Sequence, residues 1–440
     1  MPGDDHGVLT ANISNVEHVL RTNFQNYPKG ERFLTTLHDF LGTGIFNADG
    51  KTWRDQRKTA RFEFNTRSLR SFVVQCVKQE IQTRLLPFLE RISANGQAVD
   101  LQNLFERFAF DNVCKVSFGL DPGYLDPELA GGSAQDKNGC ESTTSFAEAF
   151  RDATHLSAGR FWYAIQRLWK IKKIFDIGSE RRLRESISTV HEFADQIIRS
   201  RKEEKQKDEN HDLLSRFVAS SDNYSEKFLR DIVISFLLAG RETTSSALSW
   251  FFWILSSRPD VEAKILDETR SVRAKNGGSE TGRYDFEELK EMHYLHAALS
   301  ESMRLYPPVP ANQAQAMKDD VLPDGTRIKK GWFISYNAYA MGRMEANWGK
   351  DCMEYRPERW IDADGTFRQE SPLKFTAFHA GPRMCLGKEM AYIQMKSIVG
   401  SILERFVMEI DDKGRCPEKV MSLTLRMKDG LPFRVKKRNY

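Results

Sequence analysis

One long apolar helix sets the scale of this fold. From Ser225 to Ser257 the sequence predicts a single helix of 33 residues, which Arg258-Pro259 brings to an end. At 1.5 Å per residue this helix is about 50 Å long, enough to cross a whole domain. Its middle, residues 232–240 (IVISFLLAG), is apolar on every face. We therefore expect the helix to be buried rather than to lie on the surface.

A polar run interrupts this helix directly after its apolar middle. Gly240, Arg241, Glu242, Thr243 and Thr244 follow one another there. One interpretation is a Ser/Thr-rich turn where the helix reaches solvent. The other is that a buried helix carries polar groups inward, where each needs a partner or a purpose. The segment alone favours neither.

Helical periodicity also dominates the rest of the chain. The clearest case is the apolar set Ala391, Met395, Ile398, Val399, Ile402 and Phe406. Strand signals are short and lie mainly in residues 321–336, where Pro323-Asp324-Gly325 predicts a turn. Segments rich in Gly, Pro and charge predict loops at residues 121–144, 201–210 and 274–283. The pattern indicates a mainly α protein with small β-sheets, folded as one domain over residues 1–440.

Composition excludes several classes of protein. The 440 residues carry 65 Lys+Arg against 61 Asp+Glu, a net charge of +4, which gives no electrostatic case for nucleic acid as the partner. The six cysteines lie at least 26 residues apart, so the sequence has no CxxC pair and favours a reducing compartment. The longest uncharged stretch of note is 15 residues, Thr243 to Ser257, well short of the roughly 20 apolar residues that span a bilayer.

The segment 378–387 (FHAGPRMCLG) places one thiol, Cys385, at the start of the predicted C-terminal helix. The free N–H groups and dipole of a helix N-terminus favour the thiolate, so we expect a lowered pKa for this thiol. Gly381 and Gly387 remove side chains on both sides of it, so that a flat ligand can approach the backbone. Arg383 offers a fixed cation to an acidic group of that ligand. The alternative is that Cys385, like most lone cysteines, is inert core.

Five motifs, in sequence order, resemble those of the cytochrome P-450 superfamily. Phe378–Gly387 resembles its haem-binding loop FxxGxRxCxG, and Ala239–Thr244 resembles the oxygen-activation motif (A/G)GxxT(T/S). Glu301–Arg304 resembles ExxR, Pro357–Trp360 resembles PERF, and Trp53–Arg57 resembles WxxxR. Each motif alone is weak, but five in order are a specific signal. The resemblance implies the cytochrome P-450 fold and a haem-thiolate monooxygenase.

The resemblance also implies a cofactor and the residues that hold it. The cofactor is heme b (iron protoporphyrin IX), with Cys385 as the ligand of the iron. Around the haem the resemblance places Arg383, Trp53, Arg57, Phe378, Gly381, Gly387 and Gly240. Phe378 would pack over the sulfur, and Trp53 and Arg57 would reach a haem propionate. From the residues alone, Trp53 and Arg57 would more simply belong to a surface helix.

The same resemblance assigns the remaining motif residues. Thr243 would hydrogen-bond the bound dioxygen, and Glu242 would supply protons to it through water. Glu301 and Arg304 share a helix face at i and i+3, and Arg359 would join the same carboxylate as a buried structural cluster. The alternative for this pair is a solvated surface contact worth almost nothing.

Longer stretches resemble the plant clan of fatty-acid omega-hydroxylases. They are residues 23–70, 301–310, 339–362 and 378–399, and they are most similar to the branch that oxidises the chain ends of fatty acids and of jasmonoyl-isoleucine. The implied reaction is hydroxylation of the terminal carbon of a lipophilic carboxylic acid, which some members carry on to a second acid group. Relative to that clan, we expect the N-terminal membrane anchor, first helix and first strand to be missing.

A pocket for such a substrate needs apolar walls that hold the terminal methyl group in place. The candidate walls are Leu41–Asn47, Phe236, Leu237 and Val309–Ala314. Each of these residues, taken singly, is as easily explained as core.

Two surfaces suggest partners. The basic residues Arg54, Lys58, Arg61 and Lys388 suit an acidic flavoprotein such as NADPH-cytochrome P-450 reductase, through which NADPH would supply electrons; a solvated charged face is the alternative. Residues 161–175 (FWYAIQRLWKIKKIF) mix aromatic and basic side chains as membrane-surface helices do, or pack in the core behind a basic stripe. The family implies the cytosolic face of the endoplasmic reticulum membrane.

Three hypotheses for function remain at this point. The first is an NADPH-driven monooxygenase that uses O2 on chain ends. The second is a reductase-independent haem-thiolate isomerase or dehydratase acting on hydroperoxides, which the motif with Thr243 and Glu242 disfavours. The third is a non-catalytic, truncated remnant.

Overall fold

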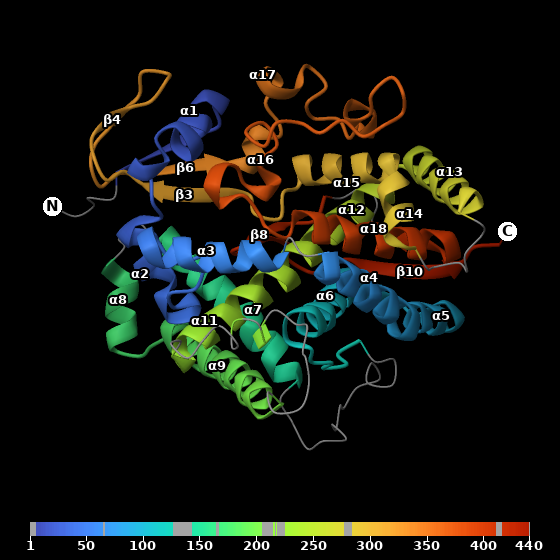
Figure 1. Ribbon diagram of the computed structural model, residues 1–440, viewed down its shortest axis with the longest axis horizontal. Helices are drawn as coiled ribbons and strands as arrows, with labels where there is room; N and C mark the ends of the chain where they lie inside the picture. Colours follow the sequence, from blue (N-terminus) through green and yellow to red (C-terminus); the bar gives the residue numbers. More distant parts are fainter. Residues whose placement is uncertain are drawn as a thin grey trace.

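The computed structural model describes residues 6–64, 67–125, 143–163, 167–204, 214–215, 217, 225–276, 284–410 and 416–439. Helices dominate it, as the sequence predicts (Figure 1). They are α1 (Ile13–Glu17), α2 (Gly30–Leu41), α3 (Gly50–Phe64), α4 (Arg67–Glu80), α5 (Leu86–Asn95), α6 (Leu101–Phe118), α7 (Thr143–Gly159), α8 (Arg167–Ile174), α9 (Ser179–Glu204), α11 (Glu226–Leu237), α12 (Thr243–Leu255), α13 (Pro259–Lys275), α14 (Phe286–Glu291), α15 (His293–Leu305), α16 (Ala338–Met341), α17 (Glu345–Trp348) and α18 (Lys388–Arg405).

The predicted long helix exists and runs through the middle of the molecule as α11, a π-helical turn η6 (Leu238–Glu242) and α12 (Figure 1). Ser225 caps its start, because its hydroxyl accepts the backbone N–H of Phe228 at 3.2 Å. The apolar middle is buried almost throughout, as expected. The π turn widens the helix at Gly240, where an added Cβ would lie 2.4 Å from the Val113 side chain. The polar run therefore lies inside the fold and not at a solvent-exposed turn.

Two three-stranded sheets flank the helices. In one, β6 (Phe333–Asn337) pairs in parallel with β1 (Gly7–Thr10) and antiparallel with β3 (Ala311–Gln315). In the other, β10 (Pro432–Lys437) pairs antiparallel with both β2 (Val99–Asp100) and β7 (Phe406–Ile410). Two hairpins complete the set: β4 (Asp320–Val321) with β5 (Arg327–Ile328), and β8 (Lys419–Met421) with β9 (Leu425–Met427).

The structure confirms strands in the predicted region, residues 321–336. The turn at Pro323-Asp324-Gly325 connects β4 to β5, and Ile334 and Tyr336 point into the core from β6. Trp332 lies one residue before β6, where its N–H closes a turn on the carbonyl of Lys329.

Some predicted boundaries are wrong. Residues 201–204 were expected in a loop but form the last turn of α9, because Arg201 turns inward and donates to the carbonyl of Phe118 at 2.5 Å. Ala274 and Lys275 likewise belong to α13. Phe406, assigned above to the C-terminal helix, is the first residue of β7. The remaining parts of the three predicted loops, including Cys140, lie mostly outside the described residues.

Candidate active site

A short loop, and not the helix itself, holds Cys385. A 3₁₀ turn (Gly381–Arg383) precedes it, and its backbone N–H donates to the carbonyl of Phe378 at 2.9 Å. Gly381 has φ +65°, and a Cβ there would lie 2.0 Å from the carbonyl oxygen of Leu20, so only glycine fits. A Cβ on Gly387 would come within 3.9 Å of the sulfur. The two glycines thus have different roles: the first permits the turn, and the second keeps space free beside the thiol.

The predicted lowering of the Cys385 pKa is wrong for this structure. Burial raises the pKa of the thiol and outweighs the opposing effects of the Gly387 N–H and of Arg57 and Lys388. The thiol lies two residues before the helix cap, Gly387, and the N–H of that cap residue is the largest of the effects that lower the pKa. The residue nevertheless keeps solvent-accessible surface. A deep thiol with accessible surface faces space that the protein atoms leave open.

The predicted cationic residues do come together beside this loop. Arg383 donates through Nη2 to the Asp49 carboxylate at 2.6 Å, and its guanidinium lies 4.4 Å above the buried ring of Trp53. Arg57, one turn further along α3, donates to the carbonyl of Met384. Burial, together with the neighbouring Arg57, lowers the pKa of Arg383 to about 10 although Asp49 opposes it.

Lys29 belongs to this cluster, and the sequence analysis missed it. Burial first, and then repulsion from Arg383, lower its pKa to about 7, because Asp49 supplies too little negative charge for both. Asp49 also accepts the backbone N–H groups of Lys29 and Gly30, each at 2.9 Å, which fixes the start of α2 against the cluster. No short-range pattern links position 29 to position 383, so only the fold could show the contact.

Thr243 and Glu242 point to different surroundings. The Thr243 hydroxyl donates to the carbonyl of Ala239 at 2.6 Å, across the π turn. The Glu242 side chain is almost fully buried and is held by Arg241 at 2.6 Å. The two residues are neighbours in the chain, but each side chain is engaged on its own side of the helix.

The structural cluster around Glu301 is confirmed in full. Arg304 meets Glu301 through two hydrogen bonds of 2.7 and 2.8 Å, and Arg359 reaches the same carboxylate at 2.8 Å. The Trp360 indole and the Arg356 backbone N–H occupy its remaining positions. Both Glu301 and Arg304 are inaccessible to solvent.

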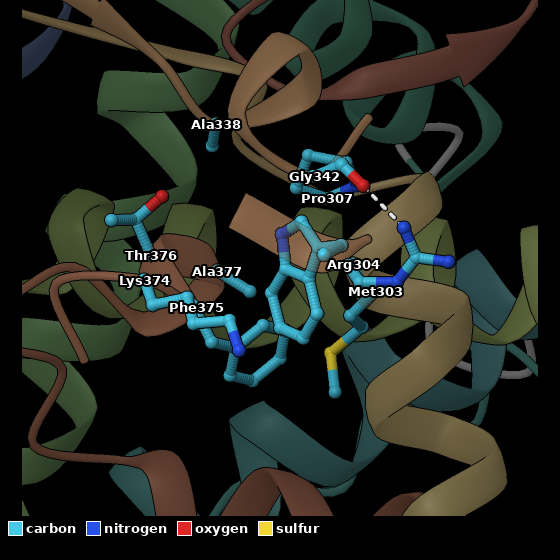
Figure 2. Close-up of a pocket in the computed structure, with 10 residues that line it drawn as sticks. Met303, Arg304, Pro307, Ala338, Gly342, Lys374, Phe375, Thr376 and Ala377 are labelled. Atoms are coloured by element: carbon cyan, nitrogen blue, oxygen red, sulfur yellow. Dashed lines mark hydrogen bonds between the residues drawn. The ribbon is translucent and has the colours of Figure 1, made fainter. Parts of the chain in front are cut away.

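Arg304 fixes the chain between α16 and the 3₁₀ turn at Pro357–Trp360. It donates to the carbonyls of Gly342, Cys352 and Glu354. It also borders a small cavity with Phe375 and other residues of the segment that leads to the cysteine loop, as Figure 2 shows. The connection to Cys385 is therefore indirect, through ring contacts of Phe375 with Trp360 at 4.8 Å and with Phe378 at 6.4 Å.

The candidate pocket wall at Leu41–Asn47 is a loop fixed by buried polar contacts. Asp231 of α11 accepts both the backbone N–H and the hydroxyl of Thr43, at 2.7 and 3.1 Å. Gln56 donates to the carbonyl of Thr43 at 2.8 Å, and Asn47 donates to that of Gly42. Such contacts give the loop a defined shape, which a wall for a flexible substrate requires.

The other candidate walls divide between core and partly open positions. Leu237 is fully buried in the core, whereas Phe236 is partly buried and its ring lies 6.3 Å from that of Phe64. In residues 309–314, Ala314 is buried and Ala311 to Gln313 of β3 keep some exposure.

Comparison with known proteins decides the family. The model of the family Cytochrome P450 matches residues 2–432. Cytochrome P450 CYP94D108 of Paris polyphylla is 51% identical over 433 residues, which cover 98% of this chain and 84% of the relative. Cytochrome P450 94A1 of Vicia sativa is 46% identical (98% and 82% covered), and cytochrome P450 94C1 of Arabidopsis thaliana is 45% identical (99% and 85%).

The chain belongs to the cytochrome P450 family. It is a monooxygenase-type oxidoreductase with relatives named as members of the 94 family, and the predicted fold class is confirmed. Among the described residues, no helix is both long enough and apolar enough to cross a membrane.

The residues of this cytochrome P450 fit the haem that the family implies. A sulfur with open space beside it is a suitable donor for iron, and the Cβ-free position at Gly387 preserves that space. Lys29 and Arg383 lie beside a single carboxylate, Asp49, and Arg57 adds a third cation next to Arg383. Haem carries two propionates, so this excess of positive charge matches its acidic edge.

Proposed function

We propose that this cytochrome P450 hydroxylates the terminal carbon of a lipophilic carboxylic acid, either a fatty acid or jasmonoyl-isoleucine. The observation that carries the proposal is the combination of an accessible deep thiol with the Thr243 and Glu242 pair on the widened central helix. The resemblance to the omega-hydroxylase clan, and relatives named in the 94 family, support the substrate class.

Haem bound through the Cys385 thiolate would supply electron donation from sulfur that favours O–O cleavage. Arg57 and Lys388 stabilise the negative charge on that sulfur, since each lowers the pKa of the thiol. Lys29, Arg57 and Arg383 would bind the propionates. Trp53 would fix the orientation of Arg383 through its ring face.

Thr243 would hold a proton at its hydroxyl on the side of the helix that faces the reaction. Its present acceptor is the carbonyl of Ala239, which lies in the π turn four residues earlier. Glu242 would deliver protons to this hydroxyl from the buried side of the same turn. This division of roles explains why the two side chains face different surroundings.

Terminal selectivity requires shape, because a primary C–H bond is stronger than its secondary neighbour. The loop Leu41–Asn47 supplies a wall whose position is fixed by Asp231 and Gln56. Phe236 on α11 and the strand residues Ala311 to Gln313 would form other parts of the pocket. A chain end that cannot fold back would then present only its terminal methyl group.

Electrons would come from NADPH through a separate reductase. Arg54, Lys58 and Arg61 are all exposed on α3, the helix that carries Trp53 and Arg57. Lys388, at the start of α18, extends the positive charge toward the cysteine loop. This basic face suits an acidic flavoprotein, and its use predicts a reduction rate that falls as salt rises.

We also propose that the protein works at the cytosolic face of the endoplasmic reticulum membrane. In residues 161–175, only Trp169 among the described apolar side chains is fully buried. Trp162, Ile171, Ile174 and Phe175 are 65%, 48%, 78% and 67% exposed beside exposed lysines. Apolar and basic side chains on one exposed segment fit a lipid surface better than core packing.

The test is turnover of NADPH with added reductase, comparing lauric acid with jasmonoyl-isoleucine and locating the new oxygen by mass spectrometry. We expect product oxidised at the chain end. Oxygen placed at an internal carbon would contradict the substrate proposal. Turnover of a hydroperoxide without NADPH would instead favour the isomerase or dehydratase hypothesis.

A variant tests the role of Thr243. Thr243→Ala should lower the product formed per NADPH by about tenfold or more and release peroxide, because the proton-holding hydroxyl is gone. Ser249→Ala is the matched control, since the Ser249 hydroxyl also donates to the carbonyl four residues earlier, at 2.7 Å. Equal coupling in the two variants would remove Thr243 from the proton path.

A further inference from the structure

Glu242 belongs to a closed ring of four buried charges. Arg241 contacts Glu242 Oε1 at 2.6 Å and Glu106 Oε2 at 3.2 Å. Arg426 contacts the other oxygen of each carboxylate, with 3.4 Å to Glu242 Oε2 and a close contact to Glu106 Oε1. The ring therefore holds two positive and two negative charges, and each arginine bridges both carboxylates.

Three distant parts of the chain supply this ring. Glu106 comes from α6, Arg241 and Glu242 from η6, and Arg426 from the hairpin strand β9. The side chains of Glu106, Arg241 and Glu242 are at most 3% exposed and that of Arg426 is 13% exposed. Buried charges are costly unless paired, and each member of the ring has two oppositely charged partners within it.

The hairpin that carries Arg426 is itself attached to the central helix. The carbonyl of Leu425 accepts the Ser246 hydroxyl at 2.7 Å and the Trp250 indole N–H at 3.1 Å. Thr424, on the same hairpin, places its hydroxyl 3.4 Å from Glu242 Oε2. Arg426 and Thr424 are therefore fixed relative to α12, and both act on one oxygen of Glu242.

We propose that Glu106 and Arg426 are positioning residues that hold Glu242 and set how readily it takes up a proton. The proposal rests on the proposed role of Glu242 as the proton donor. Every charged group that faces Glu242 in the described part of the chain belongs to the ring: Arg241 on its own turn and Arg426 from β9, both oriented by Glu106. Arg151 of α7 lies one step further out, 3.4 Å from Glu106.

A cavity borders the outer side of the ring. Its lining includes Glu106, Arg241, Arg151 and Tyr124, whereas Glu242 and Arg426 do not line it. Glu106 thus faces the cavity, and Glu242 faces inward. The ring therefore lies between the proposed proton donor and that cavity.

Charge balance gives the proposal a signed test. Glu106→Gln leaves the ring with one excess positive charge, which favours ionised Glu242. Arg426→Gln leaves one excess negative charge, which favours protonated Glu242. In the holoenzyme with reductase, the pH at which coupling is half-maximal should therefore fall by about one unit for the first variant and rise by about one unit for the second.

Two further variants complete the design. The double variant Glu106→Gln/Arg426→Gln restores a neutral ring and should return the midpoint close to that of the wild type. Lys428→Gln is the control, because Lys428 follows β9 but pairs at the surface with Glu418, and it should leave the profile unchanged. A structure of Glu106→Gln should show the Arg426 guanidinium closer to Glu242 Oε2 than 3.4 Å.

The outcomes are distinguishable. Wild-type protein that does not consume NADPH with any tested acid contradicts the proposed function. Wild-type turnover with midpoints that stay fixed, or that shift in one direction for both single variants, overturns the positioning role alone. If a single variant does not fold, Thr424→Val removes only a hydrogen bond to Glu242 and should raise the midpoint; an unchanged midpoint there also overturns the proposal.

Discussion

Two groups of buried charge in this protein differ in how they are neutralised. At Glu301, one carboxylate receives Arg304, Arg359, an indole N–H and a backbone N–H. A second carboxylate, that of Asp351, contacts Arg359 at 3.2 Å, so two carboxylates balance the two arginines. Although burial opposes it, the Glu301 carboxylate raises the pKa of Arg359. Beside Cys385, burial and repulsion from a neighbouring arginine instead lower the pKa of Lys29 and of Arg383, despite Asp49.

The difference separates structure from function. A cluster whose charges are all matched within the chain stabilises the fold and needs nothing more. A cluster with an excess of positive charge is unfavourable by itself and indicates an anionic ligand. Buried cations therefore stabilise the haem-free protein beside Glu301 and destabilise it beside Cys385. Substitutions can measure this difference in the free energy of unfolding.

The largest change in the free energy of unfolding should come from the cluster around Glu301, whose charges are balanced within the chain. Glu301→Gln leaves two buried arginines without their shared carboxylate, so we expect it to lower the free energy of unfolding by about 3 to 5 kcal/mol. Urea unfolding followed by circular dichroism measures this. Glu354→Gln is the matched control, because that exposed side chain lies in the segment that Arg304 fixes and only its carbonyl is used. A loss below about 1 kcal/mol would place Glu301 among ordinary surface pairs.

In the cluster of Lys29, Arg57, Arg383 and Asp49, which has an excess of positive charge, removing a cation should raise the free energy of unfolding. Lys29→Met should stabilise the haem-free protein at pH 7 and below, by at most a few kcal/mol, because it removes a partly buried charge that Asp49 compensates only in part. The pKa of Lys29 is lowered to about 7 from 10.5, so between these values the unfolded chain binds more protons than the folded one. As pH rises from about 7 to about 10, the free energy of unfolding of the wild type therefore increases through this group. The extra stability of Lys29→Met should disappear over the same range.

Urea unfolding of the haem-free wild type and Lys29→Met from pH 6 to pH 10 measures this effect. With haem bound, the order should reverse, since the variant then lacks one partner for a propionate. A variant that is less stable than the wild type at pH 6 without haem would contradict the assignment of an excess positive charge.

The smallest effect should come from an exposed pair with good geometry. Arg182 contacts Asp152 through two bonds of 2.5 and 2.8 Å, but its side chain is 67% exposed. Arg182→Gln should change the free energy of unfolding by less than about 1 kcal/mol, and salt should reduce the change further. A larger loss would show that geometry, and not burial and charge balance, governs the contrast.

Local pattern was sufficient for the parts of the molecule that depend on neighbours in the chain. The long central helix, the turn at Pro323-Asp324-Gly325 and the pairing of Glu301 with Arg304 all follow from spacing and from glycine or proline. The π turn was not predicted; it lies where the Val113 side chain of α6 comes close to Gly240. The helical end of α9 was missed because a charged run hid one inward-facing arginine.

The site was predictable where a motif carries it and not where contacts join distant segments. Cys385, Arg383, Trp53 and Arg57 were identified from motifs, and the structure brings them together. Lys29 and the Glu106–Arg426 ring are contacts across 300 residues or more of sequence, with no motif of their own. The predicted lowering of the Cys385 pKa was wrong because burial raises the pKa more than the Gly387 N–H, Arg57 and Lys388 lower it. A sequence pattern does not show that burial.

Reconstitution with haem, reduction and exposure to carbon monoxide test the central claim most directly. The account predicts the red-shifted absorption band of a haem with an axial thiolate, and it predicts that Cys385→Ser abolishes this band while the protein remains folded. A haem-loaded, folded wild type that lacks the band, or a Cys385→Ser variant that keeps it, would contradict the assignment of Cys385 as the ligand of the iron.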